Sequence, residues 1–129
     1  MPLILLIRHG ENDYTKNHKL AGRLPKVHLN EHGQNQAQAL AEALTKVPIK
    51  AIYSSPLERA METAAPIAKS VGLKIQREKG LLETNVGDWQ GKSLKRLRLN
   101  KHWKVVQRAP SRAQFPNGET FYECQNRIV

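Results

Sequence analysis

The chain of 129 residues carries a formal net charge of +10, with 40% hydrophobic and 25% charged residues. This length suits a single domain with its own core, and no apolar run is long enough to cross a bilayer. The apolar stretch at the start is short and has no basic region before it, so no signal peptide is predicted and a cytoplasmic location is expected by default. The single cysteine, Cys124, excludes an internal disulfide and a cysteine-based zinc site.

Apolar runs and helical patterns alternate through the first 76 residues. Residues 3–7, "LILLI", form a continuous apolar run typical of a strand buried in a parallel sheet. A helix is predicted from the N-cap Asn30 to about residue 46, and strands are predicted over 50–56 and 73–76. The intervening helix, 57–72, should end at Gly72 and be kinked or loosened at Pro66. This order predicts right-handed crossovers and an α/β fold with a mainly parallel sheet.

The basic charge is concentrated near the C-terminal third of the chain. Residues 92–108 hold seven of the 21 basic residues and no acidic residue. Apolar residues recur there at helical intervals, which predicts one amphipathic helix with a solvated basic face. The same segment leaves open another function class, a non-catalytic nucleic-acid-binding module. A further helix is predicted after Gly118 and runs to the last residue.

Charged residues follow the carboxyl ends of the predicted strands, which is the edge of an α/β sheet where ligands bind. Arg8 and His9 come directly after the first strand and begin a long loop, and Arg59 lies in the first turn of the helix after the second strand. Glu83 lies in the loop after the third strand, at the same expected edge. Two guanidinium groups converging there can bind the oxygens of a phosphoryl group, with backbone N–H groups of a helix start beside them. The sequence therefore predicts a phosphoryl-binding site.

Three motifs in this order resemble the histidine phosphatase superfamily, which includes the cofactor-dependent phosphoglycerate mutases. They are "RHGEN" after the first strand, "SSPLERAMETA" after the second and "LLETNVGDWQG" after the third, and "HLNEHGQNQAQAL" is also similar to that family's first-helix entry. The resemblance implies a three-layer α/β/α fold. It also implies that His9 attacks phosphorus, that Arg8 and Arg59 hold the phosphate, and that Glu83 protonates the departing oxygen. No cofactor and no metal are implied.

The resemblance also implies a substrate site lined by the long loop. Thr15, Gly22 and Arg23 occupy the matching positions, and Thr15 stands where mutases commonly carry Asn. We therefore expect hydrolysis of small phosphate monoesters, with a phosphoglycerate-type mutase as the alternative within the family. A small phosphorylated compound is the expected partner, and neither a membrane nor a nucleic acid is the preferred one.

One motif of the family has no counterpart in this sequence. The family carries a second histidine in a "SHG"-like motif at the end of a later strand, whereas none of the other histidines here follows an apolar strand; these are His18, His28, His32 and His102. We therefore expect residues 1–129 to form a partial domain without its last strands, whose own activity is an open question. An uncovered edge beside the "LILLI" strand would favour self-association.

Overall fold

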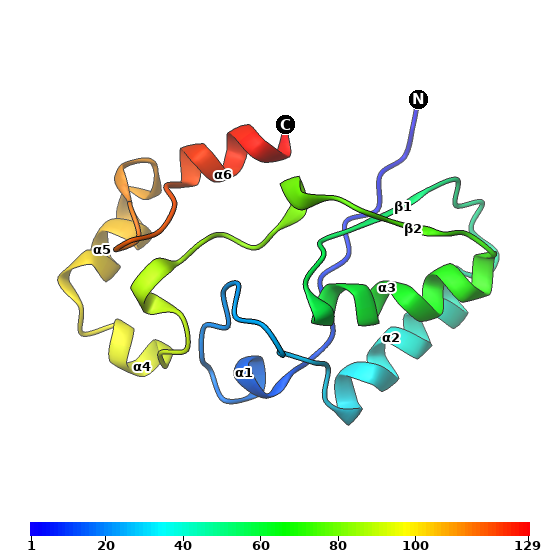
Figure 1. Ribbon diagram of the computed structural model, residues 1–129, viewed down its shortest axis with the longest axis horizontal. Coiled ribbons are helices and arrows are strands. Elements are labelled where there is room, and N and C mark those ends of the chain that lie inside the picture. The colour runs from blue at the N-terminus through cyan, green and yellow to red at the C-terminus, as the bar shows by residue number, and fades with distance from the viewer.

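A two-stranded parallel sheet and two long helices form one part of the molecule in the computed structural model, which describes all residues from 1 to 129. Strands β1 (Ile52–Ser54) and β2 (Ile75–Arg77) pair in parallel, with Ile52 opposite Ile75. Helix α3 (Glu58–Val71) connects them and packs on both, and α2 (Glu31–Leu44) packs on α3 (Figure 1). The predicted α/β fold with a parallel sheet is therefore confirmed.

Local sequence signals explain the bounds of these two helices. The Asn30 side chain accepts a hydrogen bond from Gly33 N and caps α2, and Gly72 closes α3 in the left-handed conformation with φ of 69°. Small side chains let the helices approach closely, because alanines are buried in both, at positions 37, 41, 64 and 68. Helix α3 continues through Pro66.

The prediction of a strand over residues 3–7 is wrong. This segment makes no backbone hydrogen bond to any other part of the chain, and a strand requires such a partner. Its side chains are correspondingly exposed, from 44% for Ile7 to 94% for Leu6. The apolar run is therefore an extended, unpaired segment that leads directly into Arg8 and His9.

The prediction of a single basic helix over 92–108 is also wrong. The segment divides into α4 (Leu94–Leu97) and α5 (Lys101–Arg108) because the Asn100 side chain accepts a hydrogen bond from His102 N and starts a new helix. Between the two helices Leu99 is exposed, whereas Leu97 is buried. The basic side chains of the two helices face solvent, with Lys95, Arg96, Arg98, Lys101, Lys104 and Arg108 all exposed.

Aromatic packing holds the C-terminal part together. Trp89 stacks on Trp103 at 5.9 Å and meets Phe115 edge-on at 5.3 Å, within a cluster that includes Leu97. The surrounding short elements are α1 (Asp13–Lys16), three 3-10 turns (Lys79–Leu81, Gly87–Trp89 and Pro110–Arg112) and α6 (Phe121–Ile128). Thr120 and Glu123 form a capping box that starts α6, the predicted last helix.

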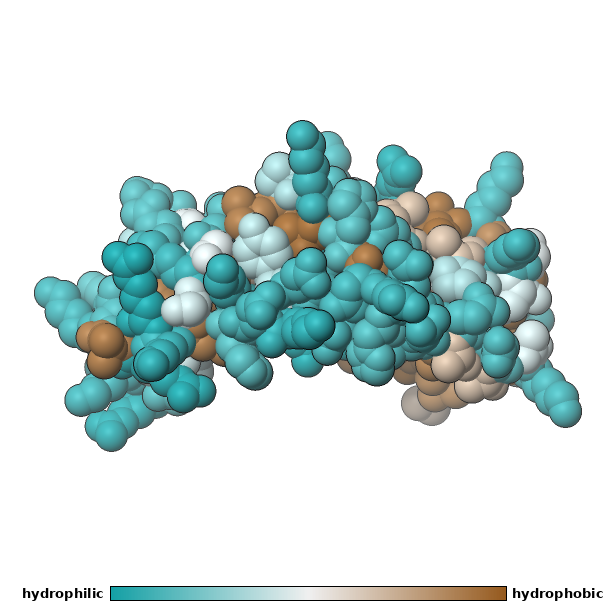
Figure 2. Space-filling view, turned by 90° about the horizontal axis from the view of Figure 1, so that it is seen from below, coloured by the Kyte–Doolittle hydropathy of each residue, from teal (hydrophilic) through white to brown (hydrophobic).

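The molecule is elongated, with α4, α5 and α6 gathered at one end and the sheet with α2 and α3 at the other (Figure 1). The 78–86 loop crosses between them, and its first turn, Lys79–Leu81, contacts α6. Figure 2 shows one long face that is mostly hydrophilic, with hydrophobic residues confined to patches. None of the helices combines the length and the apolar character that a bilayer crossing needs.

Candidate active site

The turn that carries His9 is fixed by main-chain and side-chain contacts to α2 and α3. Gly10 N donates to Thr63 Oγ1 at 3.0 Å, and Thr63 Oγ1 donates to the Arg59 carbonyl at 2.7 Å. A Cβ on Gly10 would lie 2.6 Å from the carbonyl oxygen of Gly33, so this approach requires glycine. Thr63 was not predicted, although its position one helical turn after Arg59 in "ERAMETA" is a signal that could have found it.

The geometry of the His9 imidazole leaves one nitrogen free to react. Nδ1 lies 2.8 Å from the Gly10 carbonyl oxygen. A carbonyl can only accept, so Nδ1 carries the proton and donates it, and Nε2 keeps an unshared electron pair. Burial lowers the pKa of His9, the hydrogen bond to Gly10 and the charge of Glu83 oppose this, and the positive charges of Arg59 and Arg8 lower it further. The lowered pKa favours the neutral imidazole at pH 7, and a neutral imidazole with a free Nε2 has the chemistry of a nucleophile.

Arg59 offers a buried, unpartnered donor. The residue is only 2% exposed, and its Nη2 donates to the Gly22 carbonyl at 2.7 Å. The other terminal nitrogen, Nη1, is buried without a hydrogen-bond partner. Buried polar groups are rarely left unpaired, and a guanidinium with a free N–H suits an anion such as a phosphoryl oxygen. This arrangement fits the predicted phosphate-holding role of Arg59.

Arg8 and Glu83 complete the predicted set around the imidazole. Arg8 is exposed, and its positive charge acts on His9 from the neighbouring position. Burial lowers the pKa of Arg59, and the negative charge of Glu83 opposes this lowering, as it also does for the pKa of His9. The structure thus brings Arg8, His9, Arg59 and Glu83 into one electrostatic group, although they come from three separate segments.

A cavity of about 570 Å³ opens beside His9, a size that suits a small organic phosphate. Arg59 and Glu83 do not line it; its lining residues are Arg8, His9, Gly10, Glu11, Thr15, His18, Gln36, Ala37, Leu40 and Thr63. No group of three or more His, Cys, Asp or Glu side chains lies close enough together to hold a metal ion.

Of the three loop residues predicted to line the substrate site, only Thr15 lines this cavity, and Gly22 and Arg23 lie outside it. The Thr15 hydroxyl donates to Asn12 O at 2.9 Å and accepts from Asn12 N at 3.0 Å, so Thr15 completes the capping box of α1, whose N-cap is Asn12, and the residue also lines the cavity. Gly22 supplies the carbonyl that orients Arg59. The Arg23 guanidinium contacts the Glu83 carbonyl at 2.7 Å and the Glu119 carboxylate at 3.4 Å.

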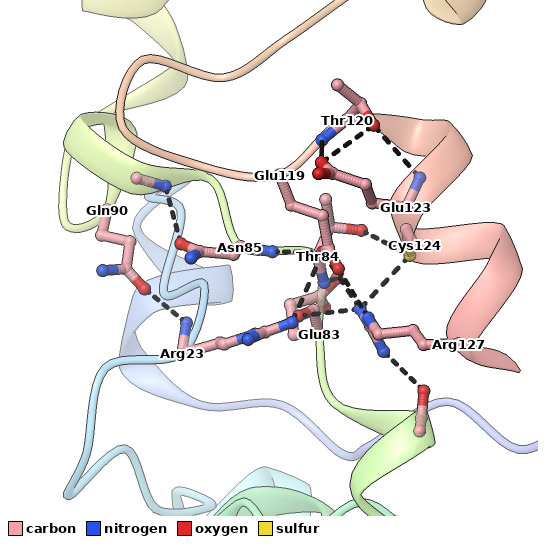
Figure 3. A network of polar contacts seen from close by, with 12 residues as sticks. Arg23, Glu83, Thr84, Asn85, Gln90, Glu119, Thr120, Glu123, Cys124 and Arg127 are labelled. Carbon is pink, nitrogen blue, oxygen red and sulfur yellow. Dashed lines mark hydrogen bonds and ion pairs between the residues drawn. The ribbon is translucent and has the colours of Figure 1, made fainter.

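Two further residues join this network without any sequence signal that would have identified them. Glu119 accepts from Arg127 Nε at 2.6 Å, and Arg127 also reaches the Glu83 carbonyl (Figure 3). The hydrogen bond from Arg127 lowers the pKa of Glu119, and that carboxylate raises the pKa of Arg127. Both side chains are therefore charged at neutral pH.

Comparison with known proteins gives matches over nearly the whole chain. The family model described as the histidine phosphatase superfamily (branch 1) matches residues 4–129. A phosphoserine phosphatase 1 of Hydrogenobacter thermophilus is 30% identical over 131 residues, which is 99% of this chain and 61% of that protein. A 2,3-bisphosphoglycerate-dependent phosphoglycerate mutase of Thermoplasma acidophilum is 36% identical over 92 residues, 71% of this chain and 46% of that protein.

A solved structure gives the same result for the fold. The mycobacterial glucosyl-3-phosphoglycerate phosphatase in complex with VO3 superposes with a TM-score of 0.85 and 31% identity, over 93% of this chain and 60% of that one. The chain thus spans about 60% of the length of these phosphatases. This share agrees with the prediction that residues 1–129 correspond to part of the family's domain.

Proposed function

Because the chain belongs to branch 1 of the histidine phosphatase superfamily, we propose that it hydrolyses small phosphate monoesters through a phosphohistidine intermediate on His9. The observation that supports this most is the His9 tautomer, in which Nδ1 donates to the Gly10 carbonyl and Nε2 is left as the nucleophile. Two of the similar proteins are named as phosphatases, which supports hydrolysis.

The proposed reaction has two steps. Arg8 and Arg59 hold the phosphoryl oxygens, the latter through its unpartnered Nη1, and neutralise the charge that develops on them. His9 Nε2 forms a bond to phosphorus while the bond to the ester oxygen breaks, and Glu83 gives that oxygen its proton. The Glu83 carboxylate then takes a proton from water, whose oxygen attacks phosphorus and releases phosphate and neutral His9. The cycle needs no oxidant, reductant or further reactant.

A phosphoglycerate-type mutase is the alternative with a specific observation in its favour, since one of the similar proteins carries that name. In a mutase the phosphohistidine would pass its phosphoryl group to a hydroxyl of the bound acid instead of to water. The two proposals differ in the molecule that accepts the phosphoryl group from His9. Incubating phosphorylated protein with glycerate phosphates in isotopically labelled water would distinguish them, because hydrolysis places the label in free phosphate.

The nucleic-acid-binding alternative remains a prediction based on the exposed basic residues of α4 and α5. Contacts to a polyanion release counterions, so such binding should weaken steeply as salt concentration rises. Transfer of a phosphoryl group to His9 should depend on salt far less. Measuring both at several ionic strengths with the same preparation would separate them.

The decisive experiment replaces the nucleophile. We expect His9→Ala to remove acid-labile phosphorylation by an activated aryl phosphate, and any steady-state turnover, while the far-ultraviolet circular dichroism spectrum is unchanged. His102→Ala is the matched control, because His102 is an exposed histidine of α5 outside the site. Equal phosphorylation of wild type and His9→Ala would overturn the proposal.

A further inference from the structure

The loop that carries Glu83 is held through its main chain by two arginines (Figure 3). Arg23 Nε donates to the Glu83 carbonyl oxygen at 2.7 Å, and Arg127 Nη2 donates to the same oxygen at 3.3 Å. The Glu83 carboxylate itself accepts a hydrogen bond from Thr84 N at 2.9 Å, and it has no contact with either guanidinium. The position of the carboxylate is therefore set by where the backbone is held.

Glu119 fixes both arginines in place. Its Oε1 accepts from Arg127 Nε at 2.6 Å, and its Oε2 accepts from Arg127 Nη2 at 3.2 Å and Arg23 Nη2 at 3.4 Å. The side chains of Glu119 and Arg127 are 11% and 21% exposed, so solvent screens this pair only partly. A bidentate arginine and carboxylate pair has a defined geometry, which makes Arg127 a rigid support.

The same pair contacts the loop on both sides of Glu83. Arg127 Nη1 donates to the Gly80 carbonyl, and Glu119 Oε2 accepts from Asn85 N at 2.9 Å. The loop also lies directly on α6, since a Cβ on Gly80 would be 2.6 Å from the Arg127 carbonyl oxygen. Residues 80, 83 and 85 are thus each fixed to Arg127 or Glu119, although 44 residues separate Glu83 from Arg127.

The residue that holds the Glu83 backbone, Arg23, is adjacent in sequence to Gly22, which holds the Arg59 side chain. Arg59 Nη2 donates to the Gly22 carbonyl, and the next residue, Arg23, donates to the Glu83 carbonyl. One turn of the long loop therefore orients the predicted phosphate-holding guanidinium and the predicted proton donor together. Arg127 and Glu119 make no direct contact with Arg59, so the loss of Arg127 removes no hydrogen bond of Arg59.

We propose that Arg127, held by Glu119, is a positioning residue that sets the place of the Glu83 carboxylate relative to His9. This inference rests on the function proposed above, in which Glu83 transfers the proton to the leaving oxygen. Arg127 touches neither substrate nor imidazole and acts through the 80–85 loop. Its loss should therefore impair proton transfer more than phosphate binding.

Leaving groups of different basicity test this role. An alkyl phosphate needs its leaving oxygen protonated, whereas a dinitrophenyl phosphate does not. We expect Arg127→Met to lower the single-turnover rate at which the alkyl ester phosphorylates His9 by about tenfold or more, within the range of general-acid contributions. Little change is expected in that rate for the dinitrophenyl ester, or in the ester concentration that half-saturates it. Arg127→Lys should retain part of the rate, and Arg108→Met, an exposed arginine of α5, is the control. An equal loss for both esters would overturn the proposal.

Titration of His9 followed by NMR gives a second readout that requires no turnover. The negative charge of Glu83 raises the pKa of His9, so moving that carboxylate away should lower it. We expect Arg127→Met to shift the His9 titration in the same direction as Glu83→Gln, and to have no further effect in the Glu83→Gln background. An unchanged titration in correctly folded Arg127→Met, or an equal shift in that background, would refute positioning.

These two readouts also separate failure of the inference from failure of the proposed function. If Glu83→Gln itself lowers the single-turnover rate of His9 phosphorylation equally for both esters, the role of Glu83 in protonating the leaving oxygen is wrong and the proposal falls with it. If Glu83→Gln discriminates between the esters and Arg127→Met does not, the proposed function stands and only the positioning role is refuted.

Discussion

Replacing Arg59 with lysine tests the phosphate site while keeping its positive charge. In the wild type, Nη2 donates to the Gly22 carbonyl at 2.7 Å and leaves Nη1 buried and unpartnered for the anion. The single ammonium of lysine lacks the guanidinium fork that serves both positions. Either the Gly22 carbonyl or the phosphoryl oxygen should therefore lose a charged hydrogen bond.

The size of the effect follows from that lost hydrogen bond. A hydrogen bond to a charged group contributes about 1.5–3 kcal/mol. If the anion loses it, the Kd for orthovanadate or inorganic phosphate should rise by about 10- to 150-fold. If the Gly22 carbonyl loses it instead, the cost should appear as a lower free energy of unfolding of similar size.

Isothermal titration with vanadate and chemical unfolding, performed on the same preparations, measure both alternatives. Arg108→Lys is the matched control, because it makes the same chemical change at an exposed position. If Arg59→Lys left both the Kd and the free energy of unfolding unchanged, the guanidinium would have neither role, and its assignment to the phosphate site would be refuted.

Three other changes test separate features of the structure. Gly33→Ala would place a Cβ 2.0 Å from the Glu11 carbonyl oxygen, so we expect about 1–3 kcal/mol of destabilisation in denaturant unfolding; an unaffected free energy would contradict this close contact. Because the apolar segment 3–7 is unpaired and exposed, we expect the wild-type protein to self-associate and Leu6→Lys to reduce this association, as measured by light scattering. Equal association of both proteins would exclude the segment as its cause. The hydrogen bond and charge of Glu62 raise the pKa of His28 above 6.5, so this contact stabilises the fold fully below pH 6.5 and less as the pH rises through the higher folded-state pKa. We expect His28→Gln to remove this component from the pH dependence of Tm. An identical pH profile of Tm in both proteins would argue against the pair.

The sequence predicts best what local chemistry decides. The Asn30 side chain starts α2 and the left-handed backbone of Gly72 ends α3, and the sequence predicts both from the place of each residue beside a helical pattern. The motifs predict that Arg59 and His9 lie near one another, because each follows an apolar segment that is expected to end at the same edge of the sheet. In contrast, Asn100 was not recognised as the start of a helix, since the apolar spacing around it continues without interruption.

Features that depend on distant partners could not be predicted. The run 3–7 has every local property of a buried strand, but a strand forms only with a hydrogen-bonded neighbour, and the rest of residues 1–129 supplies none. Glu119 and Arg127 likewise lie outside every recognised motif. Their relation to Glu83 arises only when α6 packs against the 80–85 loop, which the spacing of residues does not indicate.

The contact between Gly10 and Gly33 has a consequence for how steadily the imidazole is held. Most neighbouring segments in a protein are separated by side chains, whose rotamers change and whose spacing varies with them. Here two main chains meet directly, with 3.1 Å between the position of a Gly10 Cβ and Gly33 Cα. The distance between the His9 turn and α2 is therefore set by van der Waals contact between two main chains, and changes of side-chain rotamer do not alter it.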